Sequence, residues 1–321
     1  MQRFYANAIL RISASMTVRF VRPFSVAAYL SRYLGLAALS LFLIAAGIHR
    51  FGPLTTPDLV GLLMIAAGIA LVAVLLALIG LERLWTKGAR GGLSALAALL
   101  LSALPLGVVG YGAFLYWQQP KIYDISTDLA DVPEWLVMPA ANQQWLVRPA
   151  TVAKEDRDAQ AEAYASLAGR RYEGAIDRIY AAAKKMAAAQ NIRITHTKGV
   201  IGAVEAPPVV IPEQGKTPPA EEGPVEDLPS IVPVPMARPA EAPQPTFFNG
   251  SGVVLMQGET RTRIWGLRFD ILIRLKEEAE TTIVDVRVAS RYGPHDLGMG
   301  AAIAEAYLDA LDAEMQGLND N

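Results

Sequence analysis

The hydrophobic positions of this chain gather in three long runs within its first third. They are Tyr33–Ile48, Leu59–Leu81 and Leu93–Trp117, and the second has 23 residues without an ionisable side chain. At a rise of 1.5 Å per residue, a helix of that length spans roughly 34 Å, enough to cross a hydrocarbon core of about 30 Å. Three such runs in succession disfavour the alternative of buried helices in a soluble core. We therefore predict three transmembrane helices in contact with a lipid bilayer, at about 26–48, 59–81 and 93–117.

Arginine and lysine residues around these runs predict the topology. Residues 1–32 hold five arginines and no acid, the second connection holds three basic residues against one acid, and the first connection is balanced. Positively charged flanks stay in the cytoplasm. The amino terminus is therefore predicted to be cytoplasmic and everything after Trp117 to lie across the membrane, which in a bacterium means the inner membrane and the periplasm. Either Met1 or Met16 fits as the start, because arginines precede the first run in both cases.

The pattern changes after a membrane domain of residues 1–117, and shorter periodic segments predict a domain of the α+β class over 118–321. A helix is predicted from Tyr172 to Gln190, because apolar residues recur there every three to four positions. After Asn191, apolar and polar residues alternate, which predicts a strand. Three more strands and a final helix that Asp296 caps are expected at 252–262, 267–276, 281–290 and 296–315. This order predicts an antiparallel sheet with one face covered by helices.

A proline-rich insert interrupts this domain at about 205–246. It holds twelve of the 21 prolines, seven acidic residues, two basic residues and no aromatic residue. A segment of this composition buries too little apolar surface to offset the entropy lost when a chain becomes ordered. We therefore predict that the insert is disordered.

The two longest strands are expected to pair as a hairpin with one apolar and one charged face. If Glu277–Glu280 is a four-residue loop, Asp270 lies opposite Arg287 and Leu272 opposite Asp285. The apolar face then combines alternate residues of both strands, namely Leu267, Phe269, Ile271, Ile273, Leu275, Val284, Val286 and Val288. Opposite charges across a strand pair contribute roughly 0.2–1 kcal/mol each, so charge and burial are expected to specify one register together.

Composition and charge narrow the classes of function. The chain has no cysteine, which excludes disulfides, thiolate metal sites and cysteine nucleophiles. Residues 1–117 hold nine basic and two acidic residues, which leaves twenty basic and twenty-nine acidic residues, a balance of −9, for 118–321. The basic residues of 1–117 are accounted for by a membrane-spanning segment, and residues 118–321 are acidic. Neither part of the chain therefore predicts nucleic-acid binding. The histidines lack metal-ligand spacing and no phosphate-binding glycine motif occurs, so we expect neither a metal nor a cofactor.

The densest group of polar residues lies between residues 270 and 296. Its candidate binding residues are Asp270, Arg274, Asp285, Arg287, Arg291, His295 and Asp296. Arginines supply forked donors to an anion or carboxylate, and His295 can titrate near neutral pH. The alternative is a solvated sheet face with ion pairs, followed by a turn and a helix cap. A triad of Ser290, His295 and Asp296 is disfavoured because the three lie within seven residues without a nucleophile-elbow motif, so no catalytic residue is predicted.

Four segments carry a resemblance to a known family. They are IYDISTDLADVPEW (Ile122–Trp135), RRY (Arg170–Tyr172), LRFDILIRL (Leu267–Leu275) and VDVRVASRYGPHDLG (Val284–Gly298). Together with the closing helix, they resemble the bacterial family of domains of unknown function numbered fourteen-ninety-nine. Many members of that family attach this domain to inner-membrane helices. The resemblance therefore implies an anchored domain that faces the periplasm, and it implies no activity.

The sequence predicts an integral inner-membrane protein whose periplasmic domain binds an envelope partner or a small ligand. Two alternatives stay open, namely an envelope hydrolase or transferase that uses the polar cluster at 270–296, and an accessory subunit of a transporter or envelope-assembly complex. Apart from Arg32 at the border of the first, the predicted spans hold no aspartate, glutamate, lysine or arginine, which disfavours a self-sufficient carrier. Directly after the last span, IYDISTD is expected to form an extended edge strand rather than a loop that contacts a ligand.

Overall fold

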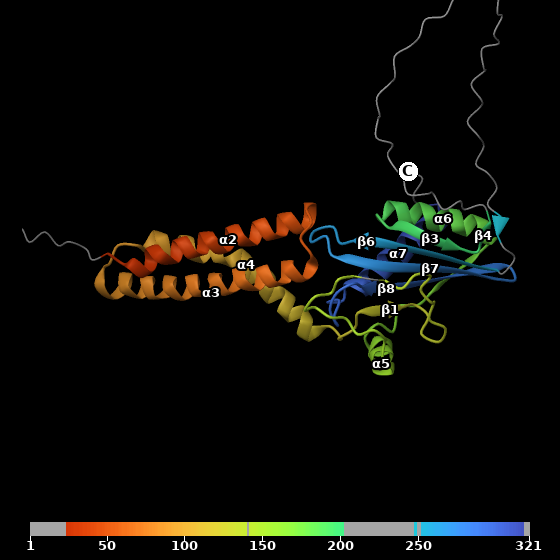
Figure 1. The fold of residues 1–321 in the computed structure, drawn as a ribbon, viewed down its shortest axis with the longest axis horizontal. Coiled ribbons are helices and arrows are strands. Elements are labelled where there is room, and N and C mark those ends of the chain that lie inside the picture. Colours follow the sequence, from red (N-terminus) through yellow and green to blue (C-terminus); the bar gives the residue numbers. More distant parts are fainter. Residues whose placement is uncertain (1–23, 140, 202–246, 249–251, 318–321) are drawn as a thin grey trace, which may run out of the picture. The chain divides into compact units, whose positions relative to one another are not determined.

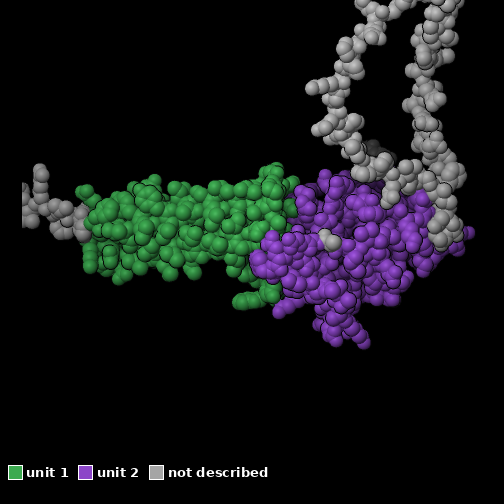
Figure 2. Space-filling model, in the orientation of Figure 1, with its two compact units in different colours: residues 1–118, 264–266 green, residues 119–263, 267–321 purple. Residues whose placement is uncertain are grey.

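The computed structural model describes residues 24–139, 141–201, 247–248 and 252–317 (Figure 1). These residues form two compact units (Figure 2). The first comprises the described residues up to Gln118 together with Ile264–Gly266, and the second comprises the others. The insert predicted to be disordered at 205–246 and both possible start residues lie outside the described residues.

Three helices form the first unit and confirm the prediction of three apolar helices of membrane-spanning length. They are α2 (Val26–Phe51), α3 (Thr56–Lys87) and α4 (Gly92–Gln118). The Ser25 hydroxyl caps α2 by accepting a hydrogen bond from the Ala28 amide at 3.4 Å. At the end of α3, Gly88 adopts the left-handed conformation with φ 61°, which glycine allows without strain. The polar caps explain why these helices begin and end where they do.

Small residues lie between these helices, and larger apolar residues point outward. Ala28 of α2, Ala77 of α3 and Ala98 of α4 belong to one buried cluster. A Cβ atom at Gly80 would lie only 2.8 Å from the Cβ atom of Ala28, so the two backbones approach closely there. Many leucine, isoleucine and valine side chains on the outer surfaces are exposed. This distribution is typical of helices that pack through small residues and are solvated by lipid.

The second unit has the predicted α+β fold. Its antiparallel sheet has the order β1-β8-β7-β6-β3, and β2 also pairs with β8. The strands of this sheet are β1 (Asp124–Ser126), β2 (Arg170–Glu173), β3 (Arg193–Lys198), β6 (Val253–Arg261), β7 (Arg268–Glu278) and β8 (Thr281–Ser290). A separate ladder pairs β4 (Val200–Ile201) with β5 (Phe247–Phe248). The helices are α5 (Lys154–Ala163), α6 (Ile176–Ala189) and α7 (Met299–Met315). Strand β1 shows that the IYDISTD segment pairs at an edge of the sheet, as expected.

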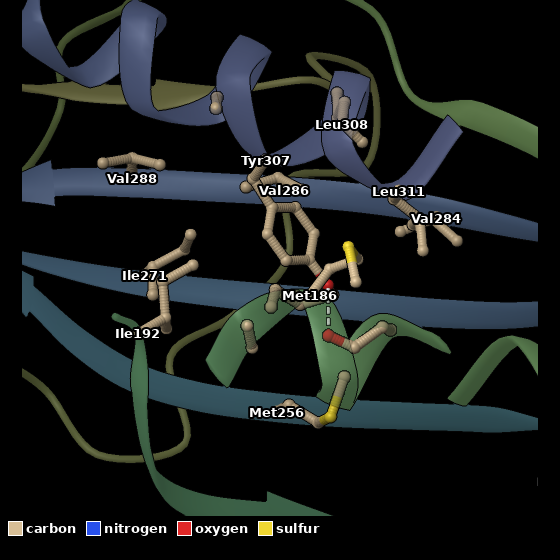
Figure 3. Packing of buried hydrophobic residues seen from close by; sticks show 14 of the residues in the cluster. Met186, Ile192, Met256, Ile271, Val284, Val286, Val288, Tyr307, Leu308 and Leu311 are labelled. Atoms are coloured by element: carbon tan, nitrogen blue, oxygen red, sulfur yellow. Dashed lines mark hydrogen bonds between the residues drawn. The ribbon is translucent and has the colours of Figure 1, made fainter. Parts of the chain in front are cut away.

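The core lies between the sheet and the helices α6 and α7, which cover one of its faces (Figure 3). Alternate residues of β7 and β8 form the sheet side of this core, as predicted: Ile271, Ile273, Leu275, Val284, Val286 and Val288. On the helix side, Tyr307, Leu308 and Leu311 of α7 are fully buried. The Tyr307 hydroxyl donates a hydrogen bond to the Ala183 carbonyl of α6 at 3.0 Å, so the largest core side chain leaves no unpaired polar atom.

The register predicted for the β7–β8 hairpin is wrong by two residues. The ladder continues to Glu278 opposite Thr281, so the loop has two residues rather than four. Ala279 takes a left-handed φ of 46°, which allows the tight reversal. As a result, Arg274 rather than Leu272 lies opposite Asp285. A shift of two residues leaves every side chain on its predicted face, which is why the core is nevertheless the predicted one.

The start of the helix predicted at Tyr172–Gln190 is also corrected. The helix α6 begins at Ile176, and Tyr172 belongs instead to β2, where it lies opposite Thr282 of β8. The Tyr172 hydroxyl donates to an Asp312 carboxylate oxygen of α7 at 2.6 Å. Pairing with β8 and this bond to α7 are contacts between residues far apart in the sequence, so the local helical periodicity does not reveal them.

Candidate functional site

The predicted polar residues of β7 lie on the face of the sheet that points away from α6 and α7. Asp270, Leu272 and Arg274 alternate with the core residues and therefore share this second face. The face is not open to solvent, because Leu272 is fully buried and both Asp270 and Arg274 are buried as well.

The described residues 128–139 and 141–148, which we call the strap, follow β1 as irregular chain and contact this second face. The Pro133 carbonyl accepts a hydrogen bond from Arg287 of β8 at 2.6 Å. Gln257 of β6 forms two hydrogen bonds with Val137, because its amide group donates to the Val137 carbonyl at 2.7 Å and accepts from the Val137 amide at 3.0 Å. The strap thus bonds to neighbouring strands of the sheet and is part of the fold.

Arg274 contacts three carboxylates. It donates to one oxygen of Asp285 through Nε at 3.1 Å and through Nη2 at 2.7 Å. It also donates to Asp128 at 2.8 Å and to Asp131 at 2.9 Å, two residues of the strap. One positive charge therefore faces three negative charges, which leaves a surplus of two negative charges around Arg274. The Asp131 side chain is 73% exposed, whereas that of Asp285 is 5% exposed.

Arg287 holds the residue that begins β1. It donates to both carboxylate oxygens of Asp124, at distances between 2.9 and 3.2 Å, in a forked arrangement. Arg157 of α5 donates to the same carboxylate at 2.9 Å. The Arg287 guanidinium also lies 4.9 Å from the centre of the Trp135 ring, a cation–π contact with the strap. These contacts hold Asp124 of β1 against β8 and α5, and they hold Trp135 of the strap against β8.

Arg291 forms a third ionic group at the other end of the hairpin. It donates to the two oxygens of Asp270 at 2.9 and 2.6 Å and to Glu259 of β6 at 2.8 Å. Arg193 of β3 also bonds to Glu259. The guanidinium groups of Arg274, Arg287 and Arg291, which the sequence suggested as anion donors, are thus all bound to carboxylates of the chain itself.

His295 and Asp296 bond mainly to the backbone. The Asp296 carboxylate accepts from the amides of Gly298 at 2.8 Å and Gly300 at 2.9 Å. It therefore pairs one amide of the first turn of α7, although the helix begins at Met299 and its N-cap residue is Gly298 rather than the predicted Asp296. The Leu297 amide donates to Nδ1 of His295 at 2.9 Å, so Nε2 of the neutral ring carries the proton toward the Gln119 carbonyl at 3.2 Å. These bonds give both residues a structural role in the turn before α7, and that role does not require a ligand.

Burial and hydrogen bonding move the carboxylate pKa values in opposite directions. Burial raises the pKa of Asp285, even though Arg274 opposes the effect. Burial alone would also raise the pKa of Asp128, but the amides of Asp131 and Ala130 and the guanidinium of Arg274 outweigh it and lower that pKa. The pKa of Glu259 is lowered against the effect of burial, because Arg291 and Arg193 stabilise its ionised form. Asp128 and Glu259 are therefore ionised at neutral pH.

An open pocket of about 390 Å³ lies at the edge of β8, beside the junction of β1 and β2. Asp128 and Asp285 line it, together with Thr127, Gly169 and Ile283. Gly169 is required for close approach, because a Cβ atom there would collide with the Asp285 carboxylate. Arg170 and Arg171 line the pocket as well, and each is paired with another carboxylate of the chain, Arg170 with Asp312 and Arg171 with Glu278. The lining therefore carries two acidic and two basic side chains.

The structure separates the seven predicted residues into three groups rather than one site. Arg274, Asp285 and Arg287 are neighbours beneath the strap, Asp270 and Arg291 pair with Glu259, and the last two residues belong to the start of α7. Sequence reasoning missed the partners Asp124, Asp128, Asp131, Arg157 and Glu259. Three of these lie in the IYDISTDLADVPEW segment. Its acidic residues could have been predicted to pair with the arginines of the hairpin. Among the described residues, no group of three or more histidine, cysteine, aspartate or glutamate residues is arranged to hold a metal ion.

Comparison with known proteins gives one match. No curated protein and no solved structure matches the chain significantly. The matched family is described as "Protein of unknown function (DUF1499)" and its model covers residues 249–311, which contain β6, β7, β8 and most of α7. The resemblance to DUF1499 is therefore confirmed for the long hairpin strands and the closing helix of this chain.

Proposed function

We propose that this protein is a bacterial inner-membrane protein whose carboxyl-terminal domain lies in the periplasm and binds an envelope partner. Residues 1–117 would form the membrane domain and residues 118–321 the periplasmic domain. The three apolar helices support membrane association, and the arginines before the first helix and between the second and third support this orientation.

The observation that carries the binding function is the engagement of the charged groups. Each of the three arginines that a catalytic or anion site would use is bound to a carboxylate of the chain. His295 and Asp296 hold backbone groups. An envelope hydrolase or transferase would have to break these contacts before the same side chains reached a substrate, and the energy of breaking a buried ion pair is several kcal/mol.

The charges that are not balanced within this network suggest the chemistry of the partner. Three carboxylates surround Arg274, and the most exposed of them is Asp131. The pocket beside them is lined by Asp128 and Asp285 and also by Arg170 and Arg171, which are paired with other carboxylates, so the exposed Asp131 carries the surplus charge. Residues 118–321 as a whole carry a balance of −9. A basic segment of an envelope protein is complementary to this acidic edge, and electrostatic complementarity speeds association and excludes acidic competitors.

Photo-crosslinking in cells tests this function. A photoreactive amino acid at Leu129, which lines the pocket, should give one discrete crosslinked product. Asp131→Lys should abolish the product, whereas Glu305→Lys on the exposed surface of α7 should not, because it adds the same charge elsewhere. In vitro, a fluorescent hexalysine peptide should bind the purified full chain with an affinity that falls with salt concentration. Equal binding by the Asp131→Lys and Glu305→Lys variants would overturn the proposal.

Two further measurements test orientation and the competing function. Alkaline phosphatase fused after Asn321 should be active, since the enzyme needs the periplasm to fold; an inactive fusion would place the domain in the cytoplasm. If the protein is instead an accessory subunit of a membrane complex, deletion of residues 119–321 should leave its copurification in mild detergent intact. Loss of copurification on that deletion is the result that binding through the outer domain predicts.

A further inference from the structure

The strap contains a stretch of thirteen residues, Trp135–Val147, that carries no ionisable side chain. We call it the WLV tract, because the chain reads Trp-Leu-Val-Met-Pro at Trp135–Pro139 and Trp-Leu-Val-Arg-Pro at Trp145–Pro149. In a domain with a balance of −9, an uncharged stretch with two tryptophans is unusual. It is also a repeat, so the same apolar pattern is presented twice within fifteen residues.

Several apolar side chains of the WLV tract are exposed. The exposed fractions are 48% for Val137, 66% for Met138, 58% for Trp145 and 60% for Val147. Trp135 and Leu136 are only partly exposed. Contiguous apolar residues on the surface of a soluble part of a protein usually mark a contact with a protein or with lipid.

The backbone beneath these side chains is held in place. Gln257 is buried and binds Val137 with two hydrogen bonds. The Gly293 amide donates to the Leu146 carbonyl at 3.0 Å, and Gln143 accepts from the Arg148 amide at 2.9 Å. The apolar side chains therefore project from a prearranged backbone, so little chain entropy is lost when a partner covers them.

The second copy of the repeat, Trp145–Val147, lies at the end of the domain where the chain leaves α4. Gln119, the residue directly after that helix, is already bonded into the domain, because its side-chain oxygen accepts from Tyr164 at 3.0 Å and its carbonyl lies 3.2 Å from Nε2 of His295. His295 is two residues after Gly293, which bonds to Leu146 of the tract. The second unit therefore begins at the residue that directly follows the candidate membrane span.

We propose that the WLV tract inserts into the interfacial region of the bilayer, with the lipid headgroups and glycerol backbones as its ligand. Tryptophan is favoured at this interface because its ring is apolar and its N–H is polar. The lack of charge avoids the energy of moving an ion toward hydrocarbon. Because the domain is covalently joined to a candidate membrane span, lipid is present at high effective concentration, and a few apolar side chains are enough for contact. This proposal does not depend on the basic partner proposed for the acidic edge.

The chain offers a direct test because it has no cysteine, so single cysteines can be labelled without background. We would attach a nitroxide to Val147→Cys in the full chain, reconstituted in nanodiscs of phosphatidylcholine, and measure its accessibility to oxygen and to a water-soluble nickel chelate. Leu71→Cys, on the outer surface of α3, is the lipid control, and Glu305→Cys on α7 is the aqueous control. The ratio of oxygen to nickel accessibility at residue 147 should be several-fold higher than at residue 305 and approach that at residue 71.

Two results would overturn the proposal. A nickel accessibility at residue 147 equal to that at residue 305 would show that the tract faces water. Protection from both oxygen and nickel would show that protein covers the tract, either a partner or a second copy of the chain. A label at Met138→Cys repeats the test on the other copy of the repeat, in case substitution of Val147 disturbs the local backbone. Failure here leaves the crosslinking test at the acidic edge unaffected, because that test uses other residues.

Discussion

Replacing Arg274 with methionine should destabilise the second unit by about 3–5 kcal/mol at pH 7, because removal of one partner leaves a buried charge uncompensated. The structure indicates which contact matters. Two of the four hydrogen bonds of Arg274 go to Asp285, whose side chain is 5% exposed. The pair with Asp131, 73% exposed, contributes at most about 1 kcal/mol. The loss should therefore come mainly from Asp285, with a smaller share from Asp128, whose side chain is 29% exposed.

The destabilisation should depend on pH. Burial already raises the pKa of Asp285, and Arg274 opposes that effect. In the variant the pKa should rise further, so folded Asp285 binds its proton more readily than the unfolded chain does. The stability deficit should therefore be small near pH 4, where the carboxyl is protonated in the folded state, and should grow as the pH rises toward 7.

Pulse proteolysis of the full chain in detergent, with urea as denaturant, measures both effects. With a slope of about 2 kcal/mol per M urea, the expected loss lowers the midpoint by about 2 M. The control is the double variant Arg274→Met and Asp285→Asn, which removes the charge at constant size and should recover part of the stability. A midpoint that falls by less than about 0.5 M, or a deficit that is the same at both ends of the pH range, would refute the reasoning.

The remaining predictions use the same assay. Gly169→Ala should destabilise by about 1–3 kcal/mol, because its Cβ would collide with the Asp285 carboxylate; an unchanged midpoint would mean that this loop adjusts freely. Asp296→Ala should lose about 1 kcal/mol and Asp296→Asn less, since an asparagine oxygen still pairs an amide of the first turn of α7; equal losses would argue against that role. Tyr307→Phe should lose about 1 kcal/mol because it removes the hydrogen bond from the tyrosine hydroxyl to the Ala183 carbonyl, and an unchanged midpoint would contradict this.

The apolar pattern predicted most of the fold. The three membrane-length helices and the core face of the β7–β8 hairpin follow from periodicity, because lipid and core each accept only apolar surfaces. The loop length was harder to predict. The residue Ala279 in the left-handed conformation is not a typical turn residue, so nothing in the sequence marks a two-residue loop there.

The candidate site was predicted as a set of residues and not as an arrangement. Arg274, Arg287 and Arg291 were singled out as candidate residues, but several of the carboxylates that they bind, such as Asp128 and Asp124, come from residues far away in the sequence. Sequence periodicity does not reveal such pairs. The strap has no periodicity at all, so its position on the sheet follows from individual bonds such as those of Gln257. Whether the seven residues bind a ligand stays a prediction.

The short ladder between β4 and β5 has a consequence for how this domain can vary. Residues 201 and 247 lie opposite each other in that ladder, so the ends of the intervening chain are brought together by the fold itself. The entropy of closing such a loop rises by only about 0.6 kcal/mol for each doubling of its length. Natural variants can therefore lengthen, shorten or replace this segment almost freely, and a reporter protein inserted between the two strands should leave the fold beneath it intact.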